Sequence, residues 1–117
     1  MSEIDDVFYS IQGRIWVETE KGPFLGIGRI ELLIKIKEMG SISKAAQEMK
    51  MSYRQAWELI ESMNTKSKNI LVTSKIGGKG GGGAMLTTEG EKAIEQFTTL
   101  NRAFKKFLEE QGHKFKL

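Results

Sequence analysis

Residues 41–63 read SISKAAQEMKMSYRQAWELIESM, and residues 75–87 read KIGGKGGGGAMLT. The first stretch predicts two short helices joined by a tight turn, because a serine that can cap a helix precedes each one and Ala45 and Ala46 allow close crossing. The second stretch predicts a β-hairpin with a glycine-rich tip. A helix-turn-helix followed at once by a hairpin is the plan of a winged helix, so DNA binding is the leading functional hypothesis.

The flanking sequence extends this plan. Alternating apolar and polar residues over 12–20 predict a strand, and apolar spacing over 29–39 predicts a helix that ends at Gly40. One face of this helix is expected to carry Ile30, Leu33, Ile34 and Lys37, and Ile36 is expected to widen this apolar stripe. The predicted fold class is mainly α with a small β component: a winged helix-turn-helix with an N-terminal strand and a long C-terminal dimerisation helix.

The whole chain, residues 1–117, is expected to form one domain. Within it, the helix-turn-helix is predicted at 41–66, the wing at 70–87 and the dimer helix at 88–111. The dimer helix is expected to begin with a capping box at Thr88, and residues 112–117 are expected to be frayed.

The dimer helix carries its apolar side chains at a heptad-like 3-4-3 spacing. They are Phe97, Leu100, Phe104 and Phe107, with Leu108 beside them. A domain this small cannot cover such a long helix along its whole length, so part of this seam is predicted to be a dimer interface. A dimer is also what a helix-turn-helix protein needs in order to read two half-sites.

The start of the third helix carries the best candidates for reading bases. Arg54 can donate two hydrogen bonds to guanine and Gln55 can exchange two with adenine, and Tyr53 can contact a phosphate or a thymine methyl group. Exposed Arg and Gln are also ordinary on any solvated helix, and Trp57 is expected to be a core residue. The candidate DNA-binding residues are Ser41, Ser43, Lys44, Ser52, Tyr53, Arg54, Gln55, Glu58, Lys66, Lys75, Gly78, Lys79, Gly80 and Gly81.

The glycine run at the wing tip exposes consecutive backbone amides, which can bind phosphate oxygens. Lys75 and Lys79 add positive charge, so we expect the tip to contact the DNA backbone or minor groove. The run is not a Walker A loop, because no GK[ST] follows and it lies between strands rather than before a helix.

The composition restricts other functions. Residues 41–83 hold seven Lys or Arg against three Glu, and the net charge of the whole chain is +3, which permits nucleic-acid binding. Cysteine is absent and His113 is the only histidine, so we predict no enzyme activity, no metal site and no cofactor. No apolar run reaches the ~20 residues of a membrane helix, and the acidic N-terminus does not resemble a signal peptide, so a cytoplasmic location is predicted.

Several motifs resemble the N-terminal DNA-binding domain of the ModE family of molybdate-responsive regulators. The resemblance runs from Gly13 to Leu108, and its helix-turn-helix is similar to that of LysR-type regulators. The motifs are Gly40-Ser41-Ile42-Ser43, Ala45-Ala46, Met51-Ser52-Tyr53, Ala56-Trp57, Met63-Asn64, Gly77-Gly78-Lys79-Gly80-Gly81-Gly82-Gly83-Ala84, Leu86-Thr87 and Gly90.

The resemblance implies a homodimer that forms through the first and last long helices, which adds Ile30 to the expected interface. It implies that residues 52–58 enter the major groove of double-stranded DNA, and it makes the genes of molybdate transport or molybdenum-cofactor synthesis candidate targets. Family members that sense molybdate carry C-terminal oxyanion-binding domains, so this chain, which stops at Leu117, is expected to be a stand-alone form that does not itself sense molybdate. Two alternatives stay open: a protein-interaction module with a winged-helix fold, and an oxyanion or nucleotide binder that uses the glycine loop.

Overall fold

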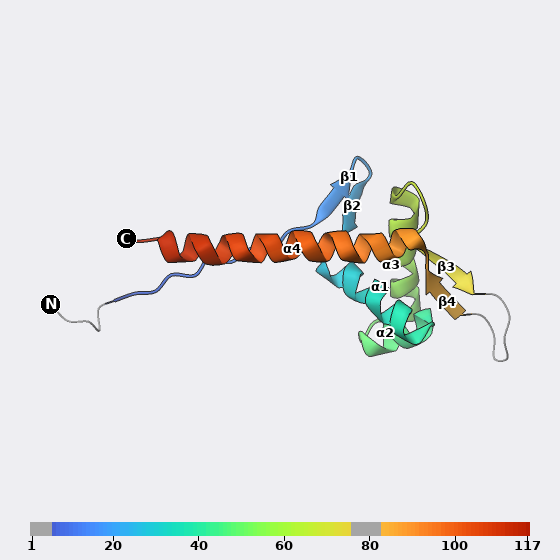
Figure 1. Cartoon of the computed structure of the whole chain (residues 1–117). Helices are drawn as coiled ribbons and strands as arrows, with labels where there is room; N and C mark the ends of the chain where they lie inside the picture. The colour runs from blue at the N-terminus through green and yellow to red at the C-terminus, as the bar shows by residue number, and fades with distance from the viewer. Residues whose placement is uncertain (1–5, 76–82) are drawn as a thin grey trace.

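The computed structural model describes residues 6–75 and 83–117, and over these residues it contains two small hairpins, three helices in a cluster and one long helix (Figure 1). Wing residues Gly78, Lys79, Gly80 and Gly81 lie outside the described part of the chain. The elements are β1 (Val17–Thr19), β2 (Gly22–Leu25), α1 (Ile27–Met39), α2 (Ile42–Glu48), α3 (Tyr53–Lys66), β3 (Val72–Lys75), β4 (Gly83–Leu86) and α4 (Thr88–Lys114). The predicted fold class, a mainly α winged helix-turn-helix, is confirmed.

Helix α1 lies at the centre of the fold, in contact with α2, β4 and α4. Because it is covered on several sides, its buried residues are Ile30, Leu32, Leu33 and Ile36. Leu32 was not on the predicted face, and Ile34, which was, is only half-buried. Lys37 was expected on that face, but its side chain is exposed and pairs with Glu91 of α4 at 3.0 Å. Gly40 ends α1 in the left-handed conformation, with φ 64°, as the sequence predicted.

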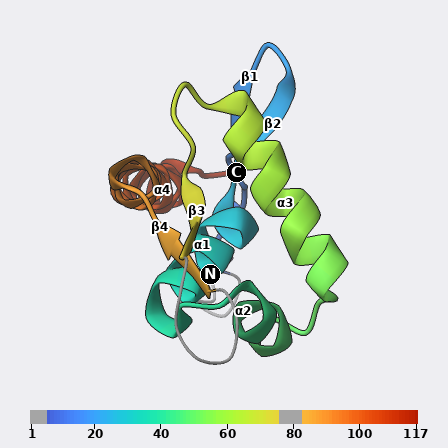
Figure 2. The same cartoon turned by 90° about the vertical axis from the view of Figure 1, so that its right-hand side faces the viewer.

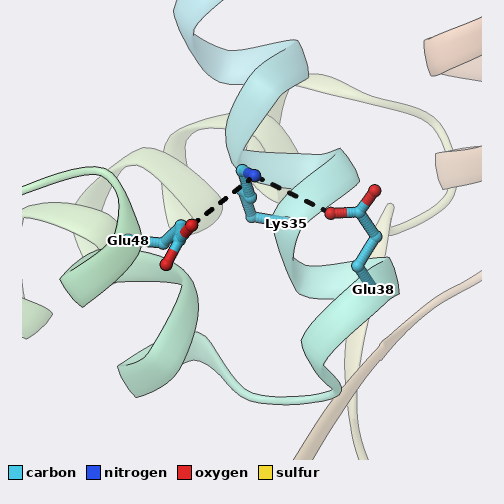
Figure 3. Close-up of polar contacts among 3 residues, drawn as sticks. All are labelled: Lys35, Glu38 and Glu48. Atoms are coloured by element: carbon cyan, nitrogen blue, oxygen red, sulfur yellow. Dashed lines mark ion pairs between the residues drawn. The ribbon is translucent and has the colours of Figure 1, made fainter.

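A second surface ion pair joins the first two helices. The Lys35 ammonium lies 3.8 Å from a carboxylate oxygen of Glu38 and 4.0 Å from one of Glu48 on α2 (Figure 3). Solvent-exposed pairs at these distances contribute at most about 1 kcal/mol each. The position of α2 therefore depends mainly on Ala45 and Ala46, which are buried against α1 and α3.

The N-terminal hairpin differs from the predicted single strand over 12–20. Only residues 17–19 form β1, which pairs antiparallel with β2, and Thr19 lies opposite Gly22. Gly22 has φ 114°, a conformation that glycine adopts without strain. The sequence predicts that residues 21–23 interrupt the strand, but Gly22 and Pro23 form the start of its partner β2.

The long helix α4 begins at Thr88, as predicted, and ends later than predicted. Its N-cap is Thr87 rather than Thr88, because the Thr87 hydroxyl accepts from the Gly90 amide at 3.1 Å. The helix continues to Lys114, so residues 112–114 are helical rather than frayed. Its first half packs on the core through Gly90, Ala93 and Phe97.

The second half of α4 projects from the helical cluster, and residues 6–16 run beside it (Figure 1). The ring of Tyr9 contacts Phe115 with centroids 5.1 Å apart, and Gly13 lies against Phe104 and Leu108. The molecule is therefore elongated, with a longest extent of 72 Å.

Candidate nucleic-acid interface

Helix α3 begins at a capped turn that directs three side chains into solvent. The Ser52 hydroxyl accepts from the Gln55 amide at 3.0 Å, which is the serine half of the predicted capping box. Tyr53, Arg54 and Gln55 of this first turn are exposed. The opposite side of α3 carries Ala56, Ile60 and Met63, which are buried as predicted. Burial of that side therefore fixes which side chains α3 presents outward.

Arg54 lies in an open position. Its Nε is 3.4 Å from a carboxylate oxygen of Glu58, one turn later, and the Arg54 side chain is 90% exposed. Such an i,i+4 pair is worth about 0.3–0.5 kcal/mol, so the guanidinium can leave Glu58 at little cost. Both side chains are compatible with base contacts, since Arg pairs with guanine and a carboxylate can accept from cytosine N4.

Helix α2 carries three further candidates in and before its first turn. Ser41 is the N-cap of α2, and its hydroxyl accepts from the Lys44 amide at 3.1 Å. Ser43 and Lys44 follow in the first turn and are exposed. The turn to α3 includes Lys50, whose φ is 56°, and Ser52 follows directly. The α2 N-terminus and the turn are thus both available to a ligand that contacts the start of α3.

The base of the wing is attached to the turn before α2. The Ala84 amide donates to the Gly40 carbonyl at 3.1 Å, and a Cβ on Gly83 would lie only 2.7 Å from that carbonyl oxygen. Lys75 pairs with Gly83 across the hairpin and is exposed. The close approach allowed by Gly83 therefore brings Lys75 next to the start of α2, and Figure 2 shows the hairpin and α3 on the two sides of the cluster, with α2 below.

Lys66 is separated from the other candidates. It lies 12 residues after Arg54 on α3, a distance of about 18 Å along a helix. Its ammonium donates to the Ser62 hydroxyl at 2.8 Å, and Arg29 donates to the same oxygen at 3.0 Å. Arg29 also donates to the carbonyls of Pro23 and Phe24, and burial lowers the pKa of its guanidinium. Lys66 thus belongs to a group of contacts that attaches β2 to α3, and its predicted DNA contact would lie apart from the start of α3.

Asn64 is a positioning residue that sequence analysis missed. Its side-chain oxygen accepts from the amides of Leu71 and Val72 at 2.8 and 3.2 Å, and its amide group donates to the Val72 carbonyl at 3.0 Å. These three bonds attach α3 directly to the first strand of the wing. The sequence signal for this role was the position of a polar residue next to a buried one on the third helix. Nothing in the sequence indicated which backbone groups it would bind.

Replacing Asn64 with alanine is expected to lower the free energy of unfolding by about 2 kcal/mol, because two amides and a carbonyl lose their partner in a half-buried place. The matched control is Asn69→Ala, since Asn69 is exposed in the loop five residues further on. Urea unfolding followed by circular dichroism measures both variants. Equal stability of the two would contradict the assigned role of Asn64.

Trp57 was expected in the core, but it is 46% exposed. It lies on the flank of α3 that faces the wing, beside a hollow that is also lined by Thr73 and Ser74 of β3. The core is filled without it, because Ala56 and Ile60 on either side already occupy the positions that point inward.

The predicted dimer residues fall into two groups. Ile30 and Phe97 are each 2% exposed and belong to the core of a single chain, which corrects their assignment to an interface. Leu100 and Phe107, in the projecting half of α4, are 45% and 55% exposed. Phe104 and Leu108 are half-buried beneath residues 6–16.

The part of the chain that the structure describes has no helix both long and apolar enough to span a bilayer. Within residues 6–75 and 83–117, no three His, Asp or Glu side chains are grouped so that they could hold a metal ion.

The arrangement defines a class of protein: a winged helix-turn-helix domain of the LysR type. A LysR family transcriptional regulator of known structure superposes with a TM-score of 0.53 at 18% identity, covering 69% of this chain and 26% of that one. ArgP from Mycobacterium tuberculosis gives a TM-score of 0.50, also at 18% identity, covering 71% of this chain and 29% of ArgP. At this identity the likeness concerns the fold alone.

Sequence comparison is more specific. The transcriptional regulator ModE of Yersinia pestis is 50% identical over 72 residues, which cover 62% of this chain and 27% of that protein. The DNA-binding transcriptional dual regulator ModE of Escherichia coli K12 is 47% identical over 72 residues, with 62% and 28% covered. The molybdenum transport protein ModE of Azotobacter vinelandii is 34% identical over 96 residues, with 82% and 36% covered. No protein-family model matches the chain.

The chain therefore corresponds to the N-terminal part of ModE-like regulators. It spans between 27% and 36% of the length of the curated relatives described above. These relatives are named for regulation and transport rather than for a catalysed reaction, in agreement with the prediction of a protein that is not an enzyme.

Proposed function

We propose that this chain is a sequence-specific DNA-binding transcriptional regulator that acts as a homodimer. The observation that carries the proposal is the capped start of α3, where Tyr53, Arg54 and Gln55 are exposed directly after the turn from α2. The two relatives named as ModE transcriptional regulators support it. The cytoplasmic location predicted from the sequence is part of this proposal, since a DNA-binding regulator must be in the same compartment as the DNA.

The mechanism follows from helix dimensions. A helix with its side chains is about 10–12 Å across, and the major groove is about 12 Å wide. The start of α3 enters this groove, so that Arg54, Gln55 and Glu58 reach base edges and Tyr53 meets the backbone or a thymine methyl group. Ser41, Ser43, Lys44 and Ser52 lie where they contact the phosphates at the groove edge. Such contacts set the register on the duplex without reading its sequence.

The wing supplies the second half of the interface. Lys75 stands at the end of β3 beside the α1–α2 turn, and it contacts the backbone next to the groove that α3 occupies. The glycine-rich tip, including Lys79, is proposed as a further phosphate contact on the strength of its sequence alone.

Dimerisation would place two recognition helices about 34 Å apart, one turn of the DNA, or at a multiple of that distance. The surface proposed for it is the projecting half of α4, with Leu100, Phe104, Phe107 and Leu108. The exposed apolar side chains of Leu100 and Phe107 support this choice.

The target genes are proposed by analogy with relatives named for molybdenum. The Azotobacter vinelandii relative is a molybdenum transport protein, and the 41% identical Rhodobacter capsulatus relative is a molybdenum-pterin-binding protein. We infer that this chain regulates genes of molybdate transport or molybdenum-cofactor synthesis. That the chain does not itself bind molybdate stays a prediction, which calorimetric titration with molybdate can test.

Selection of bound sequences from a random duplex pool, with affinity followed against salt concentration, tests the function. An enriched inverted repeat is the expected result, and its genomic matches identify the target genes. Salt-sensitive binding without enrichment would contradict sequence-specific recognition. Absence of duplex binding at low salt would instead favour the protein-interaction module, for which the exposed Glu58 and Glu61 on α3 would be natural contacts.

Replacing Arg54 with alanine is expected to weaken binding to the selected site by about 1–3 kcal/mol and to relax the preference at one base pair, because a bidentate contact to a base is lost. Fluorescence anisotropy on the selected duplex and its single-base variants measures this. The control is Arg14→Ala, which removes an exposed arginine of the N-terminal segment and is expected to keep the base preference. An unchanged preference in Arg54→Ala would remove Arg54 from the set of base-reading residues.

A further inference from the structure

A small hollow separates α3 from the wing, and Trp57 forms its exposed apolar wall. The hollow has a volume of about 170 Å³, and its rim is formed by Ile42 of α2, Glu61 of α3 and Thr73 and Ser74 of β3. Its floor is the buried pair Ile60 and Val72. Asn64 closes the far end, where it bonds the first residues of the wing to α3.

The hollow lies between the two elements proposed to contact DNA, α3 and the wing. A duplex has its major groove on one side of each phosphate backbone and its minor groove on the other. If α3 occupies the major groove and the wing lies over the adjoining backbone or minor groove, the strand between these grooves must run past the gap between the two elements. Trp57 stands at this gap with 46% of its surface exposed.

The indole of Trp57 suits a backbone contact. Tryptophan combines a large apolar face with one N–H donor, and among the described residues no acceptor is bonded to the Trp57 indole. The other tryptophan contrasts with it, because Trp16 Nε1 donates to a Glu18 carboxylate oxygen at 2.7 Å. The exposed indole face leaves apolar surface in water, and a ligand that covers this face and accepts from the N–H buries that surface while the donor stays hydrogen-bonded.

We propose that Trp57 binds the sugar-phosphate backbone of the DNA strand that passes between α3 and the wing. The indole face packs on a deoxyribose and its Nε1–H donates to a phosphate oxygen. This inference rests on the proposed function and adds a residue to its site. Glu61 on the rim repels phosphates, so the contact lies on the side of the hollow formed by Ser74, which Lys75 follows in β3.

The contact does not read bases, so its loss is expected to lower the affinity of the protein for every duplex by the same factor. Trp57→Leu is expected to bind both the selected site and a random duplex at least about tenfold more weakly, with their ratio unchanged, since a hydrogen bond to a charged group and the apolar cover are both lost. Trp57→Phe keeps the aromatic face and lacks the donor, so its affinity for DNA is expected to lie between those of Trp57→Leu and the wild type. The matched control is Trp16→Phe, whose affinity is expected to equal that of the wild type.

Fluorescence gives a second readout that does not depend on the stability of the Trp57 variants. In Trp16→Phe the only tryptophan is Trp57, and its emission is expected to be quenched or shifted to shorter wavelength as duplex is added. A fluorescein-labelled duplex reports binding in the same titration. Each variant is first checked by thermal unfolding against the wild type.

The outcomes separate the two proposals. If the labelled duplex shows no binding to the wild type, the proposed function itself is wrong. If the duplex binds while Trp57 emission stays constant and Trp57→Leu keeps its affinity, only the backbone contact is wrong. If Trp57→Leu loses affinity for the selected site but not for a random duplex, Trp57 reads a base, which also overturns the backbone contact.

Discussion

Gly90→Ala is expected to lower the free energy of unfolding by about 2–3 kcal/mol, because the new methyl group overpacks a contact between backbones. Gly90 lies in the first turn of α4, and a Cβ there would overlap the Leu71 carbonyl oxygen and touch Leu86 at 3.3 Å. That carbonyl cannot move freely, since it accepts from the Thr87 amide at 2.9 Å and from the Thr87 hydroxyl at 3.2 Å. The substitution therefore forces α4 away from the wing.

Gly28→Ala is the matched control. Gly28 lies in the first turn of α1, and an added Cβ meets no atom within 4 Å. Alanine is the better helix former, so this change is expected to raise stability by about 0.5–1 kcal/mol. Urea unfolding curves of the two variants and the wild type measure the contrast. A Gly90→Ala protein as stable as Gly28→Ala would mean that α4 does not approach the base of the wing this closely.

The double substitution Leu100→Glu with Phe107→Glu is expected to convert the protein into a monomer and to lower affinity for a two-half-site operator about 100-fold or more. Both side chains are exposed on the projecting half of α4. Replacing them with glutamate is therefore expected to leave the stability of a single folded chain nearly unchanged. In a dimer the four new carboxylates would repel one another across the helix pair. The affinity falls because the second half-site would no longer be bound intramolecularly, an advantage worth about 10²–10⁴.

Light scattering measures the mass, and titration of one-site and two-site duplexes separates dimerisation from DNA contact. Affinity for a single half-site is expected to stay unchanged, because the α3 surface is untouched. Ile70→Glu is the control for added charge, since Ile70 is 47% exposed in the α3–β3 loop. A variant that stays dimeric would contradict the proposed interface, and a wild type that is monomeric at every concentration would contradict dimerisation itself.

The sequence predicted best the features that depend on residues three or four positions apart. Ser52 caps α3 and Gly40 ends α1 as expected, because capping and left-handed conformations are chosen by the local backbone. The inward face of α3 was predicted for the same reason, since its apolar residues recur at helical spacing. The Thr87 cap was missed by one position because Thr87 and Thr88 are equally suitable by sequence.

The predictions were least accurate for the burial of large apolar side chains that could lie either in the core or at the surface. Ile30, Phe97 and Trp57 are all large and apolar, and spacing alone does not say which neighbour will cover them. Ile30 and Phe97 are buried within one chain, where α1 meets α4, whereas the helical cluster leaves Trp57 beside the wing. Residues 12–16 were expected to form the first part of a strand, but they are not in one, and Gly13 lies against Phe104 and Leu108 of α4.

The sequence by itself determined the order of the four helices and of the wing, the helix ends at Gly40 and Ser52, and the two strands of the wing hairpin. Capping hydrogen bonds and helical periodicity depend on residues that are close in the sequence. These features could therefore be predicted without knowing any contact between distant segments. Only the tertiary structure decided that Asn64 holds α3 to the wing, that Lys66 lies away from the base-reading end, and that Trp57 faces the gap. These depend on which segments meet across the chain, and that is settled when the whole core is packed.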